Sequence, residues 1–158
     1  KEVAKNKDFV CNTIIFPRNI VNNRFLDKAD FLKSFRRGPK TIFKSRLLKR
    51  AHSLLKEFIP FCSSEELDHY NGKISIPGDF FINWRSGLRK YVPIWLTILR
   101  FKSALNHAVK NEGIVHIWMH PHNLATGNKQ IELLEELFMV IQDYRDQGKL
   151  TVQTQNKF

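Results

Sequence analysis

Four stretches of the chain place apolar residues three or four positions apart, the spacing that gathers them on one side of an α-helix. They span residues 25–37, 44–59, 93–111 and 128–148. Gly38-Pro39 ends the first stretch, Pro93 suits the first turn of the third, and Asn128 is a good N-cap for the fourth. The expected buried positions are Leu26, Ala29, Leu32 and Phe35 in the first helix, and Ile131, Leu134, Leu137, Phe138, Ile141 and Tyr144 in the fourth.

Shorter apolar runs between these segments predict β-strands. Phe9–Phe16 is rich in β-forming residues and ends at Pro17. The stretch Gly113–Leu124 begins as an apolar strand and ends in a polar loop, while Lys73–Ile76 and the alternating Leu150–Gln155 are further candidates. Strands that alternate with helices favour an α/β fold with parallel strands, either a layered sheet or part of a barrel.

The composition is that of an ordinary globular protein. The chain has 158 residues, of which 42% are hydrophobic and 26% charged, so its length predicts a single domain over residues 1–158. The most apolar window, residues 91–101, is shorter than the roughly 20 residues that span a bilayer. Cys11 and Cys62 form no C-x-x-C pair, which favours a reducing compartment such as the cytoplasm.

The formal net charge of +11 is unevenly distributed along the chain. Residues 24–56 contain eleven Lys or Arg against two acids, Asp27 and Asp30. Such a segment suits an anionic partner, for example a nucleic acid, an anionic or lipid-phosphate-linked saccharide, or an anionic membrane surface. Nucleic acid is disfavoured, because aromatic residues do not alternate with the basic ones as stacking platforms would.

Polar side chains follow two of the predicted strands. In an extended backbone His116, Trp118 and His120 share one face, and His122 and Asn123 lie in the loop beyond. Pro17 likewise projects Arg18 and Asn19 past the end of the first strand. Because ligands of α/β sheets bind outside the carboxyl ends of the strands, both sets are candidate site residues.

These two stretches resemble motifs of the polysaccharide (carbohydrate) deacetylase family. Phe16-Pro17-Arg18-Asn19, with Asn22 beyond, is similar to the arginine motif of that family. Trp118-Met119-His120-Pro121-His122-Asn123-Leu124 is similar to its last motif, a strand-end histidine after an apolar strand. The resemblance extends from about Phe9 to the end of the chain but is specific only at these two motifs. It implies that residues 1–158 are the C-terminal part of a distorted (β/α) barrel.

Membership would imply a hydrolase that removes acetyl groups from a polysaccharide or sugar precursor, as in surface-polysaccharide biosynthesis. In that family a divalent metal, often zinc, polarises the acetyl group and activates water. The resemblance implies that His120 is the general acid and that Arg18 holds a catalytic aspartate. It also implies that the substrate-binding residues are Trp118, Asn19, His122 and Asn123.

The family's aspartate pair and H-x-x-x-H metal motif normally precede the arginine motif, and neither precedes Arg18. We therefore expect the metal to be bound by residues upstream of this chain, and the chain alone to be incomplete and inactive. Two alternatives remain open. One is a metal site made by His116, His120 and His122. The other is a non-catalytic binding module for saccharide or nucleic acid that uses the basic region 24–56.

Overall fold

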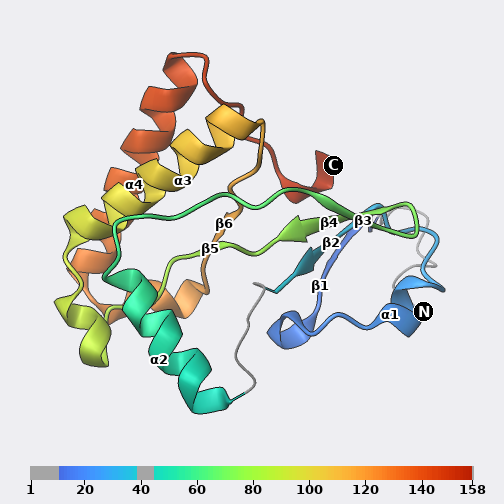
Figure 1. Ribbon diagram of the computed structural model, residues 1–158, viewed down its shortest axis with the longest axis horizontal. Coiled ribbons are helices and arrows are strands. Elements are labelled where there is room, and N and C mark those ends of the chain that lie inside the picture. The colour runs from blue at the N-terminus through green and yellow to red at the C-terminus, as the bar shows by residue number, and fades with distance from the viewer. Residues whose placement is uncertain (1–10, 39–44, 158) are drawn as a thin grey trace. The chain divides into compact units, whose positions relative to one another are not determined.

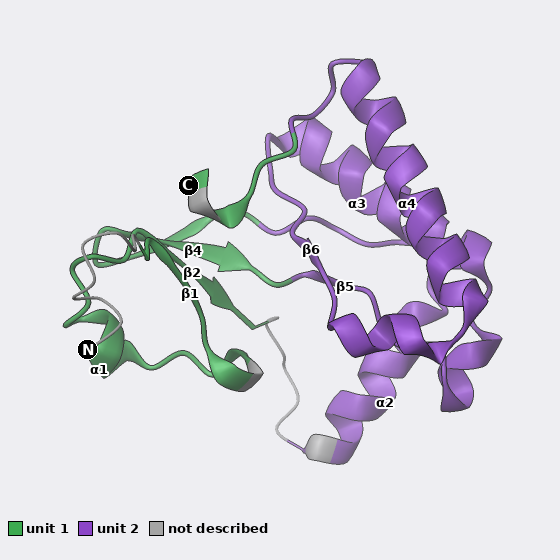
Figure 2. Ribbon diagram, turned by 180° about the vertical axis from the view of Figure 1, so that it is seen from behind, with its two compact units in different colours: residues 1–39, 66–78, 152–158 green, residues 40–65, 79–151 purple. Residues whose placement is uncertain are grey.

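The computed structural model describes residues 11–38 and 45–157 (Figure 1). The chain forms two compact units (Figure 2). Unit 1 contains residues 1–39, 66–78 and 152–158, and unit 2 contains residues 40–65 and 79–151. Both units combine helices with strands, so the predicted α/β class is confirmed, while the prediction that residues 1–158 form a single domain stays a prediction.

Unit 1 is built on a four-stranded sheet in the order β1-β2-β4-β3. The strands are β1 (Thr13–Ile15), β2 (Ser34–Arg37), β3 (Asp68–Tyr70) and β4 (Lys73–Pro77). The pairs β1–β2 and β2–β4 are parallel, as predicted, and β3 runs antiparallel to β4. Asn71 and Gly72 close this hairpin with positive φ angles of 47° and 75°, a conformation that Asn and Gly tolerate better than other residues. The strand predicted at 9–16 is confirmed at Thr13–Ile15, and the one predicted at 73–76 is confirmed over its whole length.

The helix predicted over residues 25–37 is wrong. Asn22 caps a short helix α1 (Asn23–Leu26) through its Oδ1, which accepts from the Phe25 N–H, and turns then lead into β2. The four predicted apolar positions are nevertheless all buried, together with Phe16. The spacing of apolar residues therefore identified the core residues of unit 1 but not the secondary structure of this segment. Successive turns followed by a strand can also bury residues three positions apart.

Unit 2 is organised by two long helices, α3 (Ile94–Asn111) and α4 (Asn128–Asp146), which lie side by side (Figure 1). The side chains that α3 and α4 turn toward each other form one hydrophobic core, which also includes Phe80 and Ile82. The two-stranded sheet of β5 (Phe80–Phe81) and β6 (Ile117–Trp118) is parallel. The helix α2 (Arg46–Glu57) also belongs to this unit. Among the described residues, no helix is both long and apolar enough to cross a membrane.

Two predictions for the C-terminal third need correction. The buried side of α4 is formed by Gln130, Leu133, Leu137, Val140 and Tyr144, so the predicted Ile131 and Phe138 are exposed. The predicted and the observed buried residues have Leu137 and Tyr144 in common. Because α4 is apolar on much of its circumference, the elements that pack against it determine which side is buried. The strand predicted at 150–155 is absent from the described residues, which instead form a coil and a short 3-10 helix, Gln155–Lys157. The described strands form no closed barrel.

Candidate functional site

The parallel pair β5–β6 positions the histidine cluster of unit 2. The backbone N–H groups of Phe80 and Ile82 donate to the carbonyls of His116 and Trp118, at 3.2 and 2.9 Å. Both strands therefore end at the same edge, where Asn83 and Trp84 follow β5 and His120 follows β6. This is the edge at which the carboxyl ends of parallel strands commonly bind ligands.

Aromatic and imidazole rings gather at this edge. The Phe81 and Trp118 rings lie side by side from the two strands, with centroids 4.2 Å apart. The His120 ring meets both of them edge to face at 5.5 Å and stacks on the His122 ring at 5.1 Å with only 10° between the planes. Trp84 lies 6.4 Å from His122. His120 and His122 are exposed, so the structure presents two imidazoles to solvent from an aromatic wall.

The loop that carries the histidines is held in place by Asn123. This side chain is fully buried, and its Nδ2 donates to the Ile82 carbonyl at 2.7 Å. Its backbone N–H donates to the His120 carbonyl at 2.9 Å, and its own carbonyl accepts from the Thr126 hydroxyl. The amide of Asn123 therefore fixes the loop onto the residues after β5, and its predicted role in substrate binding stays a prediction.

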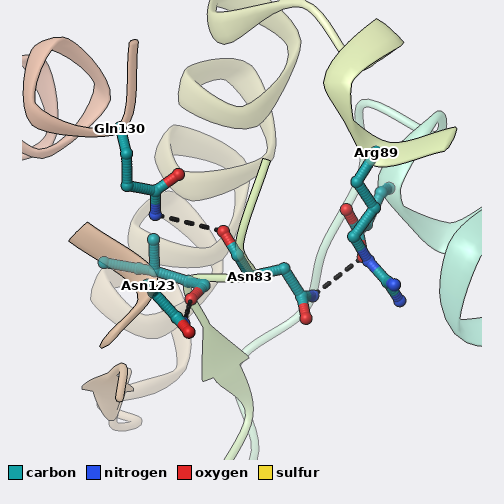
Figure 3. A network of polar contacts seen from close by, with 6 residues as sticks. Asn83, Arg89, Asn123 and Gln130 are labelled. Carbon is teal, nitrogen blue, oxygen red and sulfur yellow. Dashed lines mark hydrogen bonds and ion pairs between the residues drawn. The ribbon is translucent and has the colours of Figure 1, made fainter. Parts of the chain in front are cut away.

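A pocket next to this edge is lined by the polar side chains of Glu57, Asn83 and Arg89 together with Phe81 and Trp84. The Glu57 carboxylate at the end of α2 accepts from Arg89 Nε at 2.7 Å and from Asn83 Nδ2 at 2.8 Å. The Asn83 carbonyl in turn accepts from Gln130 Nε2 at 3.1 Å, as Figure 3 shows. This network ties α2, the segment after β5 and α4 to one another, and it leaves polar groups beside the aromatic wall.

Asp79 lies at the opposite, amino end of β5. Its Oδ1 accepts from the backbone N–H groups of Phe80 and His116, at 3.1 and 3.0 Å. Burial nevertheless raises the pKa of this carboxyl to about 6 from its usual 3.8, and the negative charge of Glu65 adds to the rise. The carboxyl therefore bridges the two strands but is poorly solvated when it is ionised.

The predicted arginine motif belongs to unit 1. Arg18 and Asn19 lie in a 3-10 helix, Pro17–Asn19, directly after β1, as the sequence predicts. The side chain of Arg18 lies outside the described part of the structure. Asn19 has a positive φ of 55°, and its Oδ1 accepts from Arg36 Nε at 3.0 Å. Their predicted roles beside a catalytic aspartate and the substrate stay predictions.

The described residues contain no group of three or more His, Cys, Asp and Glu side chains that could hold a metal ion. The alternative metal site of His116, His120 and His122 is therefore not formed. His116 and His120 are separated by the residues of a strand, and the backbone N–H of His116 is turned toward Asp79 at the other end of β5. On an extended chain, residues four apart are about 13 Å apart, which is too far for two ligands of one ion.

Glu57 and Asn83 were not among the predicted site residues. Glu57 carried a recognisable signal, because it is the single acid in a helix that is otherwise basic and apolar. Asn83 carried none, since its role depends on α2, which is distant in the sequence. No family model, no curated protein and no solved structure matches the chain.

Proposed function

We propose that the chain supplies part of the site of a carbohydrate deacetylase-like hydrolase, with His120 as the general acid and Trp118 as a wall of the sugar pocket. The observation that carries the proposal is the ring cluster at the carboxyl edge of β5 and β6. There His120 is exposed and is flanked by Phe81, Trp118 and His122. Apolar walls with a few convergent polar groups are typical of small-molecule sites.

The ring geometry suits the proposed chemistry. The His120 imidazole contacts the Phe81 and Trp118 rings edge to face, and Asn123 fixes the loop that carries it. A positioned imidazolium N–H can give its proton to the leaving nitrogen or oxygen of the sugar as the bond to the acetyl carbon breaks. The oxygen of the attacking water forms the new bond to the acetyl carbon, and the proton that this water releases restores the neutral His120 to imidazolium. General acid catalysis of this kind contributes about 10²–10⁴-fold to a rate.

The described residues do not fit the metal that this reaction requires, because they contain no group of three or more potential ligands. We propose that a divalent metal, zinc being the usual choice, is bound by residues upstream of this chain. In the same proposal Arg18 would hold an upstream catalytic aspartate, Asn19 and His122 would contact the sugar, and the two units would be parts of one (β/α) barrel.

The test is acetate release from oligomers of N-acetylglucosamine and from O-acetylated xylan fragments, by the protein extended with its upstream coding sequence. His120→Gln keeps a polar side chain but cannot deliver the proton, so kcat should fall by about 100-fold or more. His69→Gln is the matched control, because His69 is exposed on β3 of unit 1. Full activity of His120→Gln would refute the assigned role.

A second candidate function is saccharide binding without turnover, which the aromatic wall of Phe81 and Trp118 also suits. The upstream sequence separates the two candidates, since an aspartate pair and an H-x-x-x-H motif there would support catalysis. Their absence, with NMR shifts of Trp118 and His122 on titration with the same sugars, would support binding alone. Loss of the His122 shifts in Trp118→Ala with a retained fold would support a sugar bound on the aromatic wall.

A further inference from the structure

The apolar side of α2 is uncovered. Leu47, Leu48 and Leu55 are 75%, 52% and 63% exposed, and Phe58 directly after the helix is also exposed. In helical geometry these residues fall on one side of α2, together with Ala51 and Leu54. An amphipathic helix of a globular protein normally turns this side toward the core. In α2 it faces solvent instead.

Glu57 explains why the helix is oriented in this way. Among the described side chains of α2 it is the one that is buried, and it lies on the polar side of the helix. Its carboxylate is held by Arg89 and Asn83, so the polar side of the last turn contacts the rest of unit 2. The ion pair also removes the single acid of α2 from the solvent-facing surface.

The exposed charges of α2 are therefore all positive. Lys49, Arg50 and Lys56 are exposed beside the leucines, and no acid of the helix remains free to offset them. Basic residues next to an exposed row of leucine and phenylalanine are the composition of helices that lie in the plane of an anionic membrane surface.

We propose that α2 docks on an anionic phospholipid surface, with its leucines among the acyl chains and its lysines and arginine at the headgroups. Charge complementarity selects this partner over a second copy of the chain, because two copies would bring together like charges on a protein of net charge +11. It also selects lipid over nucleic acid, which would use the basic residues but leave the apolar side uncovered. This proposal does not depend on the proposed function, since it concerns a different surface of unit 2.

The test is co-sedimentation of the purified 158-residue protein with two kinds of vesicle, pure phosphatidylcholine and phosphatidylcholine mixed with phosphatidylserine. Binding is expected only to the mixed vesicles. It should weaken as salt is added, because each basic residue near an anionic surface contributes about fivefold to the affinity. This measurement needs no variant and therefore does not depend on the folding of one.

Matched double variants then locate the surface. Leu47→Gln with Leu55→Gln should lower the affinity by on the order of tenfold or more, because the apolar contribution is lost. The control is Phe138→Gln with Met139→Gln on α4, whose side chains are 57% and 60% exposed. Lys49→Gln with Lys56→Gln should also lower the affinity, and Lys102→Gln with Lys110→Gln on α3 is the control of equal charge. Circular dichroism establishes that each variant retains its helices.

Three results would overturn the proposal. The first is equal binding to both kinds of vesicle, or binding to neither. The second is a loss of affinity in the control variants as large as in the α2 variants. The third is a dimer in sedimentation equilibrium that Leu47→Gln with Leu55→Gln dissociates, which would assign the apolar side to a second copy.

Discussion

Asp79 makes the stability of unit 2 depend on pH in an unusual direction. Most carboxylates in folded proteins have a depressed pKa and stabilise the fold as the pH rises. Burial instead raises the pKa of Asp79 to about 6, so the folded protein holds a proton that the unfolded chain has already released. Between about pH 4 and pH 6 the folded state therefore binds more protons than the unfolded state, and its stability falls as the pH rises.

The magnitude follows from the difference between the pKa of 3.8 in a solvated carboxyl and about 6 in the fold. Each pH unit of difference is equivalent to about 1.4 kcal/mol, so the loss approaches about 3 kcal/mol at pH 7. Asp79→Asn removes the titration but keeps an oxygen that can accept from the backbone N–H groups of Phe80 and His116. The new amide N–H groups shift the stability by a constant amount, so the slope with pH is the quantity to compare.

The assay is urea unfolding of both proteins at a series of pH values from 4 to 8. The stability of Asp79→Asn relative to the native protein should rise by about 2 kcal/mol across pH 4–6 and become level at about pH 7. Asp146→Asn is the control, because Asp146 is exposed at the end of α4 and should give no such rise. A difference between Asp79→Asn and the native protein that is constant over this range, or that decreases with pH, would refute the reasoning.

Three further predictions concern the packing and polar contacts of unit 2. Glu57→Gln weakens the pair with Arg89, whose side chain is 22% exposed, so urea unfolding should show a loss of about 2 kcal/mol. An unchanged stability would mean that the pair is only a surface contact. Asn123→Ala removes the buried amide under the histidine loop, which should cost about 1–3 kcal/mol and broaden the NMR signals of that loop. Leu137→Ala should lower the free energy of unfolding by about 2–5 kcal/mol, because Leu137 is fully buried. Phe138→Ala should lower it by less than about 1 kcal/mol, because Phe138 is exposed. A similar cost for both would contradict the observed side of α4.

The chemistry-bearing residues were predictable from the sequence to different degrees. His120 and Trp118 were found because they alternate along a strand, and an alternating pattern fixes which side chains share a face whatever the strand pairs with. Asp79 gave no comparable signal, since its raised pKa depends on burial and on the neighbouring Glu65 carboxylate. Glu57 was visible as a lone acid in a basic helix, but its partners Arg89 and Asn83 follow it by 26 residues or more.

The sequence by itself determined which segments are strongly periodic and where they stop. Helices α2 and α3 and strand β4 lie where the pattern predicts them, because 3.6-residue and two-residue periods, together with proline and glycine at the ends, are local properties. The pattern also identified Leu26, Ala29, Leu32 and Phe35 as buried residues, since burying their apolar surface is favourable whether the backbone is helical or extended.

Tertiary structure decided the rest. Pairing of β2 between β1 and β4 outweighed the helical spacing of residues 25–37, because strand pairing satisfies backbone hydrogen bonds that a sequence pattern does not record. Packing against α3 selected Leu133 and Val140 over Ile131 and Phe138 as the buried side of α4. The hydrogen bonds of Glu57 turned the apolar side of α2 to solvent, the reverse of what its pattern alone indicates. In each case contacts between residues distant in the sequence decided the arrangement, because the local pattern does not record them.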